Sequence, residues 1–274
     1  MKKLLLLFSM SLSLFGFSFS QSISEYQGEI RYVFVDVARV RVNPQIDSKI
    51  QDALPVGHKM YIGEKTNESY MLNGFNDFWY KVKYEQNSQM KQGYIWGGLL
   101  SQKSEIYNNN LLILGIFSFK ENEGFISGVK LISNQKVISN VSFVINYFAK
   151  PSEIPDLEMN LYDNLGYRSI QAVIKVSLNS KLLAMSSYES NNRNIIIINN
   201  DQLFLMAVEN FRGEGGVGSS YEKYIFPKEK GGVENFIIFR NIITKYSEEK
   251  NKDITIKNET IRYVLENNKL VKSK

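Results

Sequence analysis

The chain has 274 residues, no cysteine and one histidine, and its formal net charge at pH 7 is +5. The missing cysteines exclude disulfides, thiolate nucleophiles and cysteine-ligated metals. The charge is small, and Lys and Arg are interleaved with Asp and Glu, so the sequence does not indicate a nucleic-acid-binding surface.

The N-terminus has the composition of a secretory signal peptide. Lys2 and Lys3 precede an apolar run over residues 4–19, and small residues lead to a cleavage point after Ser20. The competing reading is a membrane anchor, but the run is short for a bilayer, which needs about 20 apolar residues. We therefore expect residues 1–20 to be removed and the protein to be exported, to the periplasm or beyond the cell, with no transmembrane segment left. The exported chain would carry 31 basic and 28 acidic residues.

The next stretch, residues 31–101, alternates short strand-like runs with turn residues. Runs rich in β-branched and aromatic residues are separated by segments containing Asn, Pro and Gly. Two longer polar segments interrupt the pattern, of which the first, at 66–77, reads as a loop that could carry its own contact surface. About five strands in 70 residues predict a small closed barrel.

Four motif pieces in this stretch resemble, in order, those of bacterial SH3-like (SH3b) domains, and we place such a domain at residues 28–101. Asn43 stands where the family commonly has glycine, and asparagine is the next best residue for a positive φ. We expect Trp79 and Ile95 to fill the barrel core. The matching pieces are Arg41-Val-Asn-Pro44, Leu54-Pro-Val-Gly57, Trp79-Tyr-Lys-Val82 and Gly93-Tyr-Ile95 with Leu100.

The resemblance implies a docking module for cell-wall peptide or for an envelope protein, which would bind in a shallow aromatic groove. The alternative is that the aromatic residues pack the barrel. If Trp79 and Val82 point inward, strand alternation exposes Tyr80, and if Ile95 points inward, its two neighbours face the other side. The candidate ligand-binding residues are Tyr80, Tyr94, Trp96, Tyr70 and Phe75, with Phe78 beside them.

Beyond a polar connector at 104–110, residues 108–274 predict a second, β-rich domain. Roughly ten strand-like runs, mostly 8–14 residues apart, indicate an antiparallel β-sandwich or a wide barrel. The fold class predicted for the whole chain is therefore all-β. Segment 151–166 is the exception, where near-helical apolar spacing predicts a short helix or an excursion loop. Hairpin turns or short loops are expected at 133–136, 189–194, 199–201, 227–232, 247–253 and 266–269.

The segment 221–240 also resembles a stretch found in secreted bacterial proteins that place an SH3-like module before a β-rich domain of unknown function. This resemblance implies architecture and compartment and no particular chemistry.

A glycine-rich segment at 213–218 fits the G-x-G-x-x-G spacing of dinucleotide-binding loops. Phosphate binding requires a helix to open at the third glycine. The residues that follow Gly218 are aromatic, end at Pro227 and show no helical apolar stripe. We therefore interpret this segment as the tip of a hairpin.

No catalytic or metal-binding constellation is visible, and we expect no cofactor. His58 is the single histidine and has no partner at ligand or triad spacing, so we interpret it as a surface residue beside a turn. The leading hypothesis is a non-catalytic envelope protein. The alternative is a carboxylate-dependent hydrolase of the cell wall or of glycans, with its site in the C-terminal β-domain. No spacing pairs the acidic residues of the expected loops, which are Glu123, Glu158, Asp163, Glu189 and Glu214.

Overall fold

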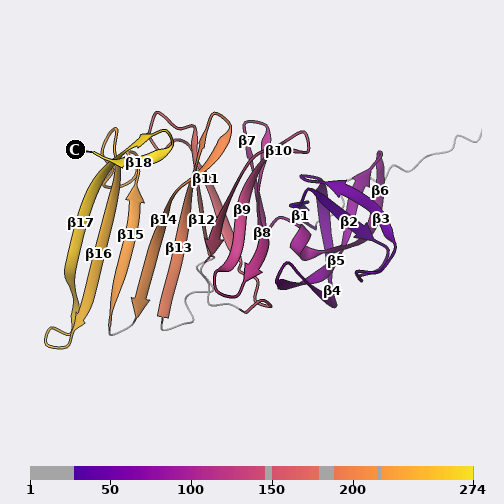
Figure 1. Cartoon of the computed structure of the whole chain (residues 1–274), viewed down its shortest axis with the longest axis horizontal. Coiled ribbons are helices and arrows are strands. Elements are labelled where there is room, and N and C mark those ends of the chain that lie inside the picture. Colours follow the sequence, from indigo (N-terminus) through magenta and orange to yellow (C-terminus); the bar gives the residue numbers. More distant parts are fainter. Residues whose placement is uncertain (1–27, 146–149, 179–187, 215–216, 274) are drawn as a thin grey trace, which may run out of the picture.

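The computed structural model of the chain describes residues 28–145, 150–178, 188–214 and 217–273. The expected signal peptide at 1–20 lies outside these residues. The described chain is built from β-strands, with one short 3-10 helix, and this confirms the all-β prediction (Figure 1). Within the described ranges, no helix is long and apolar enough to cross a membrane.

The first sheet curls around its own apolar core, and we call it the half-barrel. Its strand order is β1-β4-β5-β6-β2-β3, and neighbouring strands are antiparallel. The core contains Val40, Leu54, Val82 and Ile95, all fully buried. The elements are β1 (Glu29–Tyr32), β2 (Val37–Arg41), β3 (Ile50–Pro55), β4 (Lys59–Leu72), β5 (Phe75–Gln86), β6 (Gln89–Trp96) and the 3-10 helix η2 (Gly97–Leu99).

The expectation of a polar loop at 66–77 is wrong, because strands β4 and β5 continue through this segment as one long hairpin. The strands meet at a two-residue turn, where Asn73 has φ 54° and Gly74 has φ 84°. Asn-Gly is the dipeptide that best tolerates two positive φ angles in a tight hairpin. The polar composition of the segment therefore reflects an exposed hairpin end.

The rest of the described chain forms two further antiparallel sheets. Strands β7–β10 make a four-stranded sheet and β11–β18 an eight-stranded one. The strands are β7 (Lys103–Tyr107), β8 (Asn110–Lys120), β9 (Gly124–Ser133), β10 (Lys136–Ile145), β11 (Leu157–Tyr162), β12 (Ala172–Leu178), β13 (Tyr188–Asn199), β14 (Gln202–Glu214), β15 (Gly218–Ile225), β16 (Ile237–Ser247), β17 (Lys252–Glu266) and β18 (Lys269–Lys272).

Tight turns rich in asparagine set the register of these sheets. Two successive residues have positive φ at 108–109, 134–135, 200–201 and 267–268, and asparagine is the first residue of each pair. Its short polar side chain lowers the cost of this conformation. The turns expected around 133–136, 199–201 and 266–269 are confirmed.

Three other local expectations differ from the structure. The connector at 104–110 contains strand β7, and the turn expected at 189–194 lies inside β13, which pairs with β14. The segment 151–166 has no helix: Leu157–Tyr162 is strand β11, paired with β12. Each segment forms hydrogen bonds to a neighbouring strand, and polar composition alone does not reveal such pairing.

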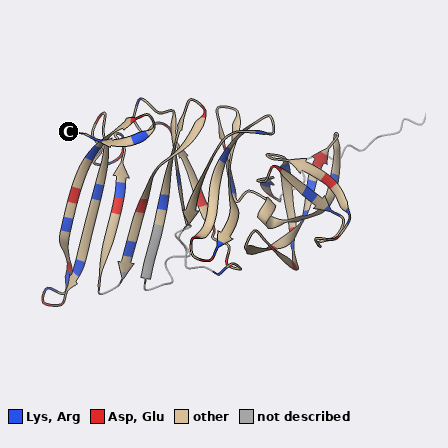
Figure 2. Cartoon of the chain, viewed as in Figure 1, with Lys and Arg blue, Asp and Glu red and all other residues tan. Residues whose placement is uncertain are grey.

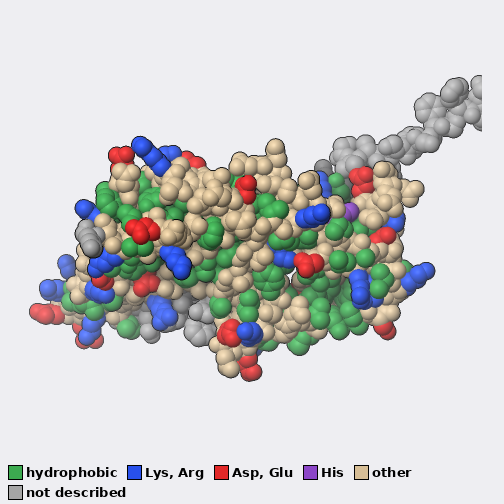
Figure 3. All heavy atoms as spheres, turned by 45° about the horizontal axis from the view of Figure 1, so that its top comes forward, with side chains coloured by type: hydrophobic (Ala, Val, Ile, Leu, Met, Phe, Trp, Pro, Cys, Tyr) green, Lys and Arg blue, Asp and Glu red, His purple; other side chains and the backbone are tan. Residues whose placement is uncertain are grey.

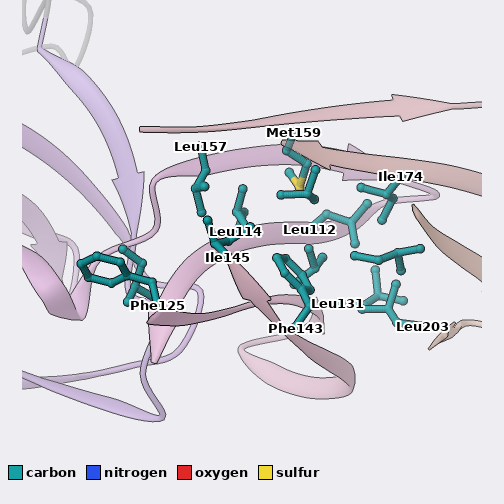
Figure 4. Close-up of a cluster of buried hydrophobic side chains, with 14 of the residues drawn as sticks. Leu112, Leu114, Phe125, Leu131, Phe143, Ile145, Leu157, Met159, Ile174 and Leu203 are labelled. Carbon is teal, nitrogen blue, oxygen red and sulfur yellow. The ribbon is translucent and has the colours of Figure 1, made fainter. Parts of the chain in front are cut away.

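One apolar core joins all three sheets. The four-stranded sheet packs on β11–β14, with β7 near β11 and β10 near β14, while β15–β18 continue the larger sheet beyond it (Figure 1). Leu112, Leu131 and Phe143 from the smaller sheet meet Met159 and Ile174 from the larger one (Figure 4). The same core includes three aromatic residues of the half-barrel, namely Phe75, Trp79 and Trp96.

Main-chain hydrogen bonds reinforce the junction between the half-barrel and the rest of the chain. The N–H of Phe119 donates to the carbonyl of Asn73 at 2.9 Å, and the N–H of Asn76 donates to the carbonyl of Pro151 at 2.9 Å. Because backbone groups and a shared core hold it, the junction has a defined geometry.

Charged side chains are dispersed over the strands. Lys and Arg alternate with Asp and Glu along the larger sheet and the half-barrel, with no single-sign stripe in this view (Figure 2). Hydrophobic side chains reach the surface in several places, including the half-barrel (Figure 3).

Candidate binding sites

Strand β6 shows why Trp96 is not an exposed ligand-binding residue. Ile95 is fully buried in the half-barrel core and Trp96 faces the other side, as alternation requires, yet Trp96 is only 2% exposed. Its Nε1–H donates to the carbonyls of Tyr70 and Asp77, at 2.9 and 3.0 Å. The expected exposure is wrong because the outer face of β6 packs into the core shared with the other sheets.

Strand β5 corrects a second expectation. Trp79 pairs with Trp96, whereas Tyr80 pairs with Ile95, so Trp79 and Val82 lie on opposite faces. Residues three apart in a regular strand cannot share a face. Val82 fills the half-barrel core, and Trp79 belongs to the shared core. Tyr80 packs partly against the half-barrel core and lines a cavity at its rim.

The remaining predicted residues divide between core and surface. Phe75 is 1% exposed and contacts Trp96, with ring centroids 5.2 Å apart, so it is a core residue. Tyr94 is partly buried against the shared core. Phe78 is partly buried beneath the Lys65 ammonium, which lies 3.6 Å from the ring centroid. Of the predicted set, Tyr70 and the largely buried Trp96 line an open groove.

We call this groove the aromatic groove. It has two connected compartments of about 420 and 300 Å³, which share Ile46, Tyr70 and Trp79. Apolar side chains are exposed around it, including Val37 at 60% and Leu72 at 37%. Arg39 lies at its edge. The lining is Pro44, Gln45, Ile46, Asp47, Glu68, Ser69, Tyr70 and Trp79 in one compartment, and Val37, Arg39, Arg41, Ile46, Tyr70, Leu72, Trp79, Trp96 and Leu99 in the other.

A second site, the junction cavity, lies where the half-barrel meets the other sheets. Its volume is about 430 Å³. The half-barrel contributes β1, β4, β5 and η2, and the opposite wall comes from the start of β7, from Ile116 and from residues 152–156. The segment 152–156 is held in place by Gln102, whose side chain donates to the carbonyl of Pro155 and accepts from the N–H of Leu157.

Asp77 is the most perturbed acidic group of the junction cavity. Burial raises the pKa of its carboxyl group from the ordinary 3.8 to about 6, against the opposing effects of the Phe78 N–H, Arg31 and Lys65. The hydrogen bond from Phe78 to Oδ1 is 2.7 Å long. A carboxyl group titrating near neutral pH in a cavity is typical of a functional site.

The basic groups beside Asp77 are engaged elsewhere. The Arg31 guanidinium makes a two-point ion pair with Glu29, at 3.0 and 3.1 Å, and its Cζ lies 5.5 Å from the centre of the Tyr80 ring. Lys65 lies over Phe78. Sequence reasoning named three aromatic residues of this cavity, Phe75, Phe78 and Tyr80, but it missed the charged groups, because these come from distant segments and share no spacing.

Two further features singled out by the sequence are the glycine-rich segment and His58. The glycine-rich segment joins β14 to β15, with Gly213 paired to Ser219 and no helix after Gly218, as the hairpin interpretation predicts. His58 is partly buried, and burial lowers the pKa of its imidazole. Among the residues that the structure describes, no three His, Asp or Glu side chains gather as a metal site would require.

No protein-family model, no curated protein and no solved structure significantly matches this chain.

Proposed function

We propose that this protein is an exported, non-catalytic component of the cell envelope whose half-barrel, an SH3-like domain, binds cell-wall peptide in the aromatic groove. The observation that carries the proposal is the groove itself, which is open and lined in both of its compartments by Tyr70 and Trp79. Aromatic residues set in a partly apolar surface are enriched at binding sites.

The chemistry of the groove fits an extended peptide. Val37, Ile46 and Leu72 offer apolar contacts to side chains, and Arg39 offers a guanidinium to a carboxylate. Cell-wall peptides carry both methyl groups and free carboxylates. Arg41 is 8% exposed, and its Nη1–H donates to the carbonyl of Ser48 at 2.6 Å, so it supports the groove wall.

The test is a titration of soluble cell-wall peptide fragments into the purified protein, together with co-sedimentation with intact peptidoglycan. We expect Tyr70→Ala and Arg39→Ala each to weaken binding about tenfold or more, as truncation of a central contact residue does. Tyr162→Ala, which removes a 40% exposed tyrosine from β11, is the matched control. Equal retention of all three variants would overturn the proposal. If the protein instead retains an envelope protein and not peptidoglycan, the ligand of the groove is a protein partner and not cell-wall peptide.

The competing proposal is a hydrolase with its carboxylates in the C-terminal β-domain, and among the described residues of that region it has one carboxylate whose pKa burial raises. Burial raises the pKa of Glu209. One oxygen of this carboxylate accepts the Tyr224 N–H at 2.7 Å, and the other pairs with Arg193 at 3.1 Å. A carboxylate held on both oxygens is poorly placed to exchange a proton with a substrate. Release of reducing ends or free peptides from peptidoglycan, lost in Glu209→Gln, would favour this alternative.

A further inference from the structure

The junction cavity is distinct from the aromatic groove and contains an acidic group, Asp77, to which no cation of the described residues is hydrogen-bonded. We propose that it is a second binding site, for a small organic ligand carrying a primary ammonium group, which Asp77 holds. The inference does not depend on the function proposed for the groove.

The hydrogen bonding of Asp77 uses one of its two oxygens and leaves the other without a hydrogen bond from the described residues. Oδ1 accepts the N–H of Phe78, which is the one hydrogen bond that the described residues give this carboxylate. Oδ2 lies against Gly97, where an added Cβ would approach it to 2.5 Å. A desolvated carboxylate normally has a hydrogen-bonded cationic partner. A ligand ammonium, with three N–H donors, would supply that partner.

The charges around the cavity also favour a cation. The lining carries four carboxylates and three basic groups. Arg31 pairs with Glu29, and Lys103 pairs with Asp156 at 3.6 Å. Once these two ion pairs are set aside, two carboxylates of the lining, those of Asp77 and Glu153, remain with one basic group, that of Lys65. The groups that face the site are therefore Glu29 and Arg31 on β1, Lys65 on β4, Asp77 and Tyr80 on β5, Lys103 on β7, and Glu153 and Asp156 in the segment before β11.

The aromatic and apolar walls indicate an organic cation and not a hydrated metal ion. Phe75, Phe78 and Tyr80 line the cavity together with Ile116 and Ile154. Aromatic faces attract ammonium groups, and aliphatic walls accept an alkyl chain. The volume of about 430 Å³ is that of a small-molecule pocket. An ammonium group on a short alkyl chain matches all three properties.

The test uses isothermal titration of cadaverine (1,5-diaminopentane) into the protein as cells export it, at pH 7.5. Two probes of the same length serve as controls, neutral 1,5-pentanediol and anionic glutarate. We expect the diamine to bind and both controls to fail. Asp77→Asn keeps the acceptor for Phe78 and removes the charge, so it should weaken binding at least tenfold. Asp253→Asn, at an exposed carboxylate on β17, should leave binding unchanged.

A second variant fills the cavity without changing its charge. Gly97→Ala places a methyl group 2.5 Å from Asp77 Oδ2 and 2.7 Å from the Tyr80 ring, and it should also weaken diamine binding at least tenfold. Circular dichroism and the thermal midpoint establish that each variant is folded. Tyr70→Ala, in the aromatic groove, should leave diamine binding intact, so the two proposals can fail separately.

Binding should also fall as the pH falls. Because the pKa of Asp77 is about 6, only about a tenth of the carboxyl groups are ionised at pH 5, and the affinity should drop about tenfold between pH 7.5 and 5. Asp77→Asn should abolish this dependence. No diamine binding, equal binding of the diol or glutarate, or unchanged affinity in Asp77→Asn would each overturn the proposal.

Discussion

Replacing Asp77 by asparagine should stabilise the protein at neutral pH. The pKa of the carboxyl group rises from 3.8 to about 6 on folding, chiefly because the group is buried. One pKa unit corresponds to about 1.4 kcal/mol, so ionised Asp77 lowers the free energy of unfolding by about 3 kcal/mol. Asparagine keeps the hydrogen bond from Phe78 and avoids that cost.

The sign of the pH dependence follows from the direction of the shift. A raised folded-state pKa means that the folded chain holds the proton more tightly than the unfolded chain. The stabilising contribution is complete below about pH 4 and is lost as the pH rises through about 6. The difference in stability between Asp77→Asn and the natural chain should therefore be about 0.5 kcal/mol at pH 4 and reach about 3 kcal/mol at pH 8.

The assay is urea unfolding of both chains at pH 4, 6 and 8, followed by tryptophan fluorescence, with Asp253→Asn as an exposed control. Comparing variants at each pH cancels the titration of every other group. A difference that does not change between pH 4 and pH 8 would refute the reasoning, because it could not come from the ionisation of Asp77. A loss of stability at pH 8 would show that the charge has a partner in the folded state.

Three further predictions concern the packing. Gly74→Ala should lower the free energy of unfolding by about 1–3 kcal/mol, because Gly74 has φ 84° and an added Cβ would lie 2.3 Å from a carbonyl oxygen. Gly213→Ala is the control: its Cβ would have its nearest neighbouring atom 3.3 Å away, so the urea midpoint should change little. Glu229→Gln should lower the free energy of unfolding by about 3–5 kcal/mol, because the buried Lys175 ammonium, now 2.6 Å from the Glu229 carboxylate, would lose this ion pair. In a double-mutant cycle, adding Lys175→Met should restore most of the lost stability. Trp96→Phe should cost about 1–3 kcal/mol because two carbonyls lose their donor, and an unchanged thermal midpoint would contradict this.

Local sequence patterns predicted those parts of the fold that depend on neighbouring residues, namely strands and tight turns. Apolar alternation identified most strands, and Asn-rich dipeptides identified turns such as 134–135 and 200–201. In segment 66–77 two signals conflict: the polar composition predicts a loop, whereas Asn73-Gly74 is a strong signal for a tight hairpin turn, which the structure contains.

The candidate sites were less accessible to sequence reasoning. Alternation correctly put Ile95 and Trp96 on opposite faces of β6, but it cannot say what covers the outer face. That depends on residues of the other two sheets, which in this core run from Tyr107 to Leu203. The carboxylate of Asp77 acquires its raised pKa from the same long-range packing, so no local motif predicts it.

The shared core also determines whether the half-barrel can exist apart from the rest of the chain. A fragment ending at residue 101 would expose the apolar surfaces of Phe75, Trp79 and Trp96, which now lie at most 2% exposed among side chains of the other sheets. Large exposed apolar surfaces promote aggregation. A unit that evolution can move between proteins must carry its whole core with it. The half-barrel does not, so its exchange for another unit would require matched changes in the sheets against which it packs.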